Sequence, residues 1–178
     1  VGVKNEHIAG FHQNYEIIPG AIDMFEGFSE ENILEIAERY DVVIGTIFSS
    51  MRLVRKIVEI NPHIMPAYYI QDYEPLFFDE GSEKWKEAFD SYDLVPNAFL
   101  FAKTQWIIDE VQRHHASKLH KVSPSIDHSI YKPVSRVQDG KMHNAVMIRP
   151  ATPRRGADRS MRVLSRLSQK YPGRLSFH

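Results

Sequence analysis

Five segments place apolar residues three or four positions apart, a spacing typical of helices with one buried face. Residues that cap or end helices stand at the limits of these segments. The predicted helices cover residues 33–40, 53–58, 85–92, 107–111 and 161–171. The predicted N-terminal caps are Ser29, Ser49 or Ser50, and Thr104, and the third helix follows Gly81-Ser82. Asn61-Pro62 and Pro172-Gly173 are expected to end helices.

Short runs rich in apolar and β-branched residues separate the helices, and we expect them to be buried strands. The runs cover residues 42–48, 65–70, 98–102, 119–122 and 145–148, and another begins at residue 175. Strands that alternate with helices at this spacing favour βαβ units. The sequence therefore predicts an α/β fold, with a Rossmann-like, mostly parallel sheet and flanking helices.

A polar stretch without helical period predicts a linker at residues 132–144. It would separate a first domain at residues 1–131 from the beginning of a second at 145–178. The sequence starts with Val and stops as a strand begins, so we expect it to be a piece of a longer protein. We expect neither a signal peptide nor a membrane-spanning helix, which needs about 20 apolar residues. The absence of cysteine excludes disulfide scaffolds and thiolate metal sites.

The net charge of −1 conceals a division along the chain. Residues 1–140 hold 13 basic and 22 acidic side chains, a net charge of −9. Residues 141–178 hold 9 basic side chains and 1 acidic one, a net charge of +8. The basic part could bind nucleic acid, acidic lipid headgroups or the phosphates of a small ligand. The alternative is a solvated basic helix face.

Ligands of open parallel sheets bind at the carboxyl ends of the strands. The residues that follow each predicted strand are therefore candidates for a site, and many of them are polar or charged. They are residues 46–50, 71–75, 103–104, 123–127 and 149–156.

Gln71, Asp72 and Glu74 directly follow a predicted buried strand. In an extended tail, Asp72 and Glu74 would point the same way. Amides and carboxylates suit the hydroxyl groups of sugars, and either carboxylate could act as a general base if burial raised its pKa. The alternative is structural, because both carboxylates could cap the following loop or pair with Lys84.

Arg149, Arg154 and Arg155 precede the last predicted helix, which begins near Gly156. The free N–H groups and the positive dipole end of a helix N-terminus attract phosphate. Arginine binds phosphate bidentately, and Gly156 would allow a close backbone approach. The segment predicts a diphosphate site, although it is neither a Walker motif nor a G-x-G-x-x-G motif. A basic loop in water is the alternative.

Residues 122–133 resemble the V-x-P-x-G-V-D-x-x-x-F-x-P segment that closes the N-terminal domain of the family 4 glycosyltransferases, which have the GT-B fold. In that segment Ser125, Ile126 and Tyr131 stand where the family has Gly, Val and Phe. Two further motifs follow the same family, and the resemblance spans about residues 40–178.

Residues 148–156 resemble the family's G-R…K-G stretch, whose Arg and Lys hold the donor diphosphate. Arg149 falls on the family's Arg, and Arg155 falls on its Lys. Residues 69–78, together with Ser91-Tyr92, resemble a subgroup that includes bacterial rhamnosyltransferases of surface polysaccharide synthesis.

The resemblance implies transfer of a sugar from a nucleotide-diphospho-sugar to a glycan or lipid-linked glycan. It implies retention of anomeric configuration, no cofactor and no metal, with arginine stabilising the leaving diphosphate. It also implies a cytoplasmic protein, at the inner face of the membrane. The expected site residues are Asp72 and Glu74 for catalysis, Arg149, Arg155 and Gly156 for the donor phosphates, and Thr46, Ser49, Gln71 and Asp127 for the acceptor.

Two motifs of the family have no counterpart in this sequence. One is the E-x7-E motif that orients the donor, and the other is the glycine-rich first loop of the N-terminal domain. We therefore expect that these 178 residues alone do not turn over substrate.

Two other function classes stay open. Arg155, Arg159, Arg162 and Arg166 are spaced to share one helical face and could follow a nucleic-acid backbone. A nucleotide-sugar epimerase would share the architecture but would need no glycan acceptor. The nine histidines lack the spacing of a metal site, so we expect no metal centre.

Overall fold

The computed structural model describes residues 2–3, 25–26, 30–135, 139–148 and 155–178. The chain forms two compact units, Val1–Ser125 and Ile126–His178. The predicted cap Ser29 and the predicted phosphate ligand Arg149 lie outside the described residues, and so does Arg154.

The first unit is an α/β fold, as predicted. Its strands are β1 (Gly2–Val3), β2 (Phe25–Glu26), β3 (Val42–Gly45), β4 (Met65–Ile70), β5 (Phe99–Ala102) and β6 (Leu119–Lys121). Its α-helices are α2 (Glu30–Arg39), α3 (Met51–Ile60), α4 (Glu83–Asp90) and α5 (Gln105–His114), and two 3-10 turns are η1 (Phe48–Ser50) and η2 (Glu74–Phe77).

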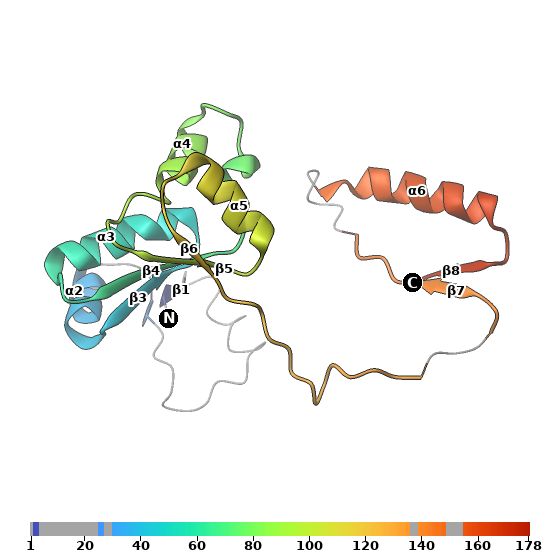
Figure 1. Cartoon of the computed structure of the whole chain (residues 1–178), viewed down its shortest axis with the longest axis horizontal. Coiled ribbons are helices and arrows are strands. Elements are labelled where there is room, and N and C mark those ends of the chain that lie inside the picture. The colour runs from blue at the N-terminus through green and yellow to red at the C-terminus, as the bar shows by residue number, and fades with distance from the viewer. Residues whose placement is uncertain (1, 4–24, 27–29, 136–138, 149–154) are drawn as a thin grey trace. The chain divides into compact units, whose positions relative to one another are not determined.

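Strands β3 to β6 form a parallel sheet in their sequence order, and β1 pairs with β2 separately. Each crossover between neighbouring strands carries one helix. Right-handed crossovers that all step in the same direction place their helices on one face. Figure 1 shows α3, α4 and α5 on the same side of the sheet.

The core lies between this sheet and the helices that cover it. Tyr68, Ile70 and Leu100 point into it from the strands, and Ile107 and Val111 meet them from α5. The predicted buried side of α5 is thereby confirmed. A smaller cluster joins α2 to α3 through Ile33, Ala37, Ile57 and Ile64.

The opposite face of the sheet carries exposed apolar side chains. Side chains alternate between faces along a strand, and the register places Ile44 beside Ala67 and Phe99 on this face. Ile44 is 52% exposed, Met65 50% and Phe99 40%. We call this the open sheet face. Parallel sheets are normally covered on both sides, whereas in the described part of the chain these side chains stay exposed.

The predicted cap Thr104 is confirmed, and Ser82 caps the helix that was expected to follow it. Ser82 Oγ accepts a hydrogen bond from the N–H of Trp85 at the start of α4, and Thr104 Oγ1 accepts one from Ile107 in α5. Ser50 precedes α3, but its hydroxyl does not cap that helix.

Strand β3 is shorter than predicted because Ser50 folds back onto the residues that follow it. The Ser50 hydroxyl accepts hydrogen bonds from the N–H groups of Thr46 and Ile47, at 3.1 and 3.3 Å. It also donates to the carbonyl of Ile47 at 2.6 Å. The chain therefore turns after Gly45 and does not continue as a strand to residue 48.

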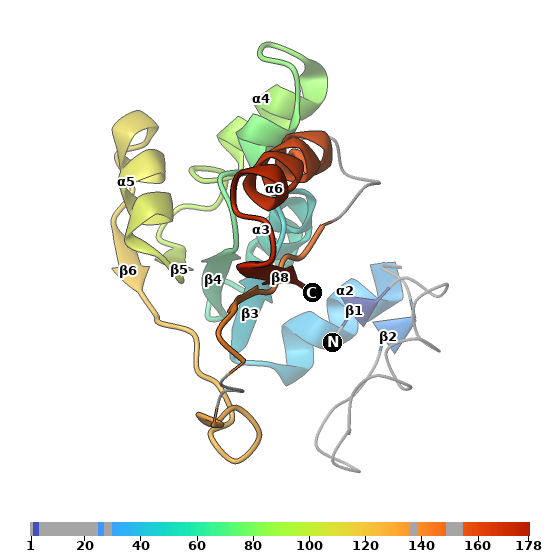
Figure 2. The same cartoon turned by 90° about the vertical axis from the view of Figure 1, so that its right-hand side faces the viewer.

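The second unit contains β7 (Met142–Asn144), α6 (Ala157–Lys170) and β8 (Leu175–Phe177). Figures 1 and 2 show α6 on one side of the parallel pair β7–β8. The strand predicted at 145–148 lies three residues earlier, inside the predicted linker, because pairing with β8 sets its position. The last hydrogen bond of that pairing runs from the Val146 N–H to the carbonyl of His178.

Among the described residues, no helix combines the length and the apolar character that a membrane crossing requires.

Candidate functional site

The carboxyl ends of β3 and β4 meet through Gln71 and Thr46. Gln71 Nε2 donates a hydrogen bond to the carbonyl of Thr46 at 3.0 Å, across 25 residues of sequence. Both side chains are exposed, and so is Ser49 in the turn that follows β3. Three of the predicted acceptor ligands therefore belong to one edge of the sheet, where they offer an amide and two hydroxyl groups.

Glu74 lies beneath this edge and is only 9% exposed. Its Oε2 atom accepts a hydrogen bond from the N–H of Phe48 at 2.7 Å and another from the hydroxyl of Tyr68 at 3.0 Å. One carboxylate thus links η2, strand β4 and the turn after β3. It holds the backbone of the turn that carries Thr46 and Ser49.

Two buried tyrosines complete the surroundings of Glu74. The Tyr92 hydroxyl accepts a hydrogen bond from the Glu74 N–H and donates one to the carbonyl of Asp72, at 3.1 and 3.4 Å. The rings of Tyr68 and Tyr92 stack with their centroids 5.7 Å apart. Burial, together with the neighbouring Glu74 carboxylate, raises the pKa of both phenols well above 10, so they remain donors.

Burial raises the pKa of the Glu74 carboxyl above its ordinary value of 4.5. The hydrogen bonds from Phe48 and Tyr68 oppose this rise, and the nearby Asp72 charge adds to it. A raised pKa is one attribute of a general base. Both hydrogen bonds reach the same oxygen, Oε2, so the carboxylate already has structural partners.

Asp72 and Glu74 do not share an extended tail, because the 3-10 turn η2 begins at Glu74. Asp72 is half-buried, and its Oδ1 atom accepts a hydrogen bond from the adjacent N–H of Tyr73 at 3.0 Å. Asp72 therefore has the structural role considered for these carboxylates, a hydrogen bond that caps the following loop. No ion pair with Lys84 is found in the part of the chain that the structure describes.

A small cavity of about 120 Å³ opens beside Phe48, on the helix side of this edge. Arg52 and Glu87 face each other there, with 3.3 Å between Nε and Oε1. Its lining residues are Phe48, Arg52, Glu87, Asp90, Ser91 and Leu94. The cavity is large enough to hold water.

Asp127, the last predicted acceptor ligand, belongs to the second unit. Its Oδ1 atom accepts hydrogen bonds from the hydroxyl and the N–H of Ser129, at 2.6 and 2.8 Å. These bonds hold the pKa of the exposed Asp127 carboxyl below 3.8. Asp127 thus closes a turn, and its other oxygen is the one that could meet a ligand.

Arg155 and Gly156 stand at the start of α6, and the Arg155 side chain is exposed. Gly156 is the N-cap and has φ of 66°, a left-handed conformation that glycine adopts without strain. A cavity of about 390 Å³ opens beside them, lined by Met147, Ile148, Arg155, Ala157 and Ser160. Arg155 and two residues of the first turn of α6 therefore line one hollow.

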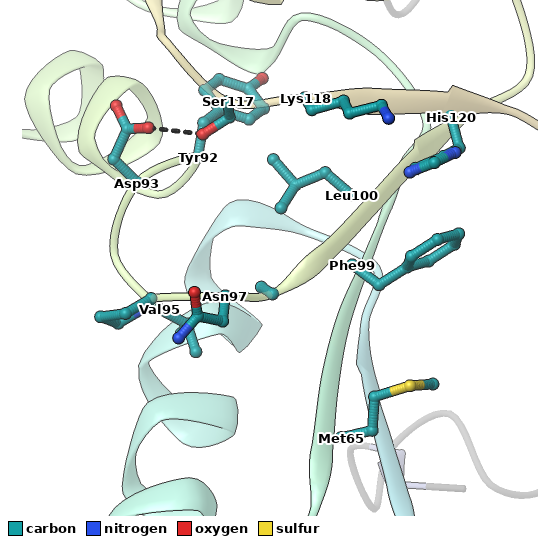
Figure 3. A pocket seen from close by; sticks show the side chains of 12 residues that line it. Met65, Tyr92, Asp93, Val95, Asn97, Phe99, Leu100, Ser117, Lys118 and His120 are labelled. Atoms are coloured by element: carbon teal, nitrogen blue, oxygen red, sulfur yellow. Dashed lines mark hydrogen bonds between the residues drawn. The ribbon is translucent and has the colours of Figure 1, made fainter.

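A cavity of about 650 Å³, larger than the two described above, lies at the amino ends of β5 and β6 and includes no predicted site residue (Figure 3). Phe99 and Leu100 line it, and the Ser117 hydroxyl donates to Asp93 at its rim, at 2.7 Å. Asp93 also bonds Nδ1 of His115 at 2.6 Å. His115 is 6% exposed, and its Nε2 atom has no partner among the described residues.

No group of three or more metal-ligating side chains is found within the described ranges. Sequence reasoning assigned no site role to Tyr68 or Tyr92 and no turn role to Ser50, although these residues hold the candidate site together. The sequence indicated only that Tyr68 and Tyr92 belong to the core. Their hydroxyl groups bond Glu74, which is 6 and 18 residues away, and such distant partners leave no local pattern. Ser50 was predicted to cap a helix. Serine is also common in turns, because its hydroxyl bonds nearby backbone groups, and this property was the available signal for its role after β3.

Comparisons with protein-family models, curated proteins and solved structures found no match to this chain.

Proposed function

We propose that this chain is part of a GT-B glycosyltransferase. The enzyme transfers a sugar from a nucleotide-diphospho-sugar to a glycan or lipid-linked glycan in surface polysaccharide synthesis, at the inner face of the cytoplasmic membrane. In this proposal the first unit is a Rossmann-like acceptor domain, and the second is the beginning of the donor domain. The sequential parallel order of β3 to β6 is compatible with half of a doubly wound sheet.

The observation that carries the proposal is the setting of Arg155. An arginine can bind phosphate with two parallel hydrogen bonds. The first N–H groups of α6 have no partner within the helix and are oriented toward an incoming anion. The hollow of about 390 Å³ at this point has room for a diphosphate. We assign Arg155 and Gly156, together with Arg149 from the sequence, to the donor phosphates.

The acceptor would bind at the carboxyl edge of β3 and β4. Thr46, Ser49 and Gln71 are exposed there and supply hydrogen-bonding groups for sugar hydroxyls. In the transfer, the bond between the anomeric carbon and the diphosphate oxygen breaks, and the acceptor oxygen bonds to that carbon and loses its proton. Asp72 is the more accessible carboxylate for this proton, whereas Glu74 is buried and positions the turn.

Nuclear magnetic resonance tests the donor half-site directly. We expect uridine, thymidine or guanosine diphosphate to shift the amide resonances of Gly156 and Ala157. Arg155→Gln should weaken this binding about tenfold or more, because a charge-assisted hydrogen bond contributes about 1.5–3 kcal/mol. Arg174→Gln, which removes an exposed arginine elsewhere in the second unit, is the matched control.

Unchanged spectra with all three nucleotides would end the proposal, as would equal weakening by both variants. A glycosyl-transfer assay on the same 178-residue chain should show no turnover. If sugar transfer were detected, the expectation that further segments are needed would be wrong.

A further inference from the structure

We infer that α6 docks on an anionic lipid surface through Arg159, Arg162 and Arg166. At 100° per residue, these three positions fall within a sector of about 60° on one face of the helix. They extend for about 10 Å along it, at a rise of 1.5 Å per residue. The inference concerns a membrane contact and does not depend on the proposed sugar transfer.

The three guanidinium groups are exposed and have no carboxylate partner among the described residues. Other helical arginines do have carboxylate partners, as Arg55 has in Glu59 at 2.8 Å and Arg52 in Glu87 at 3.3 Å. The acidic residue of α6 is Asp158, in its first turn. The three side chains therefore form a cationic face that is not neutralised locally, and we call it the arginine face.

Apolar side chains continue the arginine face around the helix. Val163 is 51% exposed and Leu167 36%. Viewed down the helix axis, Val163 lies about 40° from Arg159, and Leu167 lies about 40° further in the same direction. A helix with cations beside exposed aliphatic groups matches the boundary between lipid headgroups and acyl chains. The cations would contact lipid phosphates while Val163 inserts beside them.

The same features favour lipid over nucleic acid. A nucleic-acid backbone offers phosphates but no apolar layer for Val163 and Leu167. Proteins that bind single strands also place aromatic side chains where bases can stack, and the arginine face carries none. Arg155 precedes the helix and is therefore not part of this face.

Co-sedimentation of the full 178-residue chain with vesicles tests the inference. Vesicles of equal parts phosphatidylcholine and phosphatidylglycerol should carry the protein down, whereas pure phosphatidylcholine should not. Each cation at an anionic surface raises partitioning about fivefold, so Arg159→Gln/Arg162→Gln/Arg166→Gln should lower it about 100-fold. Added salt should also weaken the binding of the unaltered chain, because salt screens the charges on both surfaces.

The matched control removes three cations from α3 as Arg52→Gln/Arg55→Gln/Lys56→Gln, and it should leave the partition coefficient unchanged. The nucleoside diphosphate titration should also be unchanged in the α6 variant, which separates lipid binding from the donor site. Failure of the phosphatidylglycerol vesicles to sediment the chain would overturn the inference. An equal loss in the α3 control, or tighter binding to RNA through the same arginines, would overturn it too.

Discussion

Glu74 Oε2 lies 2.7 Å from the backbone nitrogen of Phe48, although 26 residues separate them in the sequence. Glu74 belongs to the turn after β4, and Phe48 to the turn after β3. The contact is a partly buried, charge-assisted hydrogen bond, which is stronger than one between neutral groups. It makes the geometry of one loop at the candidate acceptor edge dependent on a side chain from its neighbour.

Removal of the Glu74 carboxylate should destabilise the fold. Glu74→Ala leaves the Phe48 N–H and the Tyr68 hydroxyl without their acceptor, and we expect a loss of about 2–4 kcal/mol in the free energy of unfolding. Glu74→Gln keeps one acceptor oxygen and should lose about 1 kcal/mol or less at neutral pH. Urea denaturation measures both, with Glu80→Ala as an exposed control. Similar small losses in all three variants would show that the contact does not form in solution.

The same residue predicts a pH dependence. Because the folded-state pKa of Glu74 is raised above 4.5, its contribution to stability is fully present below about pH 4.5 and is lost as the pH rises through the folded value. Glu74→Gln cannot ionise, so its stability relative to the unaltered protein should improve across that window. Denaturation curves collected from pH 4 to 8 provide the comparison. A stability difference that does not vary with pH would contradict a raised pKa.

Asp93 should act in the opposite direction. Burial, the largest single influence, raises the pKa of its carboxyl, but the hydrogen bonds from His115 and Ser117 outweigh it and lower the pKa below 3.8. A lowered pKa stabilises the fold above about pH 3.8, and that contribution is lost as the pH falls through the folded value.

Asp93→Asn should therefore cost about 1 kcal/mol at pH 7, a value kept small because the Asp93 side chain is half exposed. The loss should become smaller in acid, as the pH falls toward the folded-state pKa of Asp93. Thermal denaturation at pH 7 and at pH 3 checks this, with the exposed Asp90→Asn as control. An equal loss at both pH values would point to packing instead of charge.

Gly45 should tolerate no side chain. A Cβ atom there would stand 2.4 Å from Sδ of Met51 and 3.0 Å from Oγ of Ser50. Met51 is fully buried, so it has little room to move. Gly45→Ala should therefore cost about 1–3 kcal/mol by overpacking. In a Met51→Ala background the cost should largely disappear, and a double-mutant cycle that shows additivity would contradict the clash.

Much of the first unit could be predicted because its signals are local. The apolar run at residues 65–70 coincides with β4, and the spacing of Ile107, Ile108 and Val111 marks the buried side of α5. Both follow from which side chains must leave water. Element ends were harder to predict when a partner set them. The Ser50 hydroxyl ends β3 early, and pairing with β8 moves β7 out of the apolar run at 145–148.

The candidate site was predictable only in outline. The rule that ligands bind at the carboxyl ends of parallel strands drew attention to Gln71 and Glu74. It carries no information about the hydrogen-bond partners of these residues. The bonds of Glu74 to Phe48 and Tyr68 depend on how two turns pack, and packing leaves no mark in a local pattern. Sequence reasoning treated Glu74 as a catalytic candidate, whereas its contacts also fit a positioning role.

The open sheet face has a practical consequence for anyone who purifies this chain. Ile44, Met65 and Phe99 present adjoining aliphatic and aromatic surface to water on a layer that lacks a helical cover in the described residues. When two such surfaces associate, apolar area leaves water and the free energy falls. Concentrated stocks should therefore self-associate reversibly and bind hydrophobic dyes, and charged replacements at Ile44 and Met65 should keep the sample monodisperse.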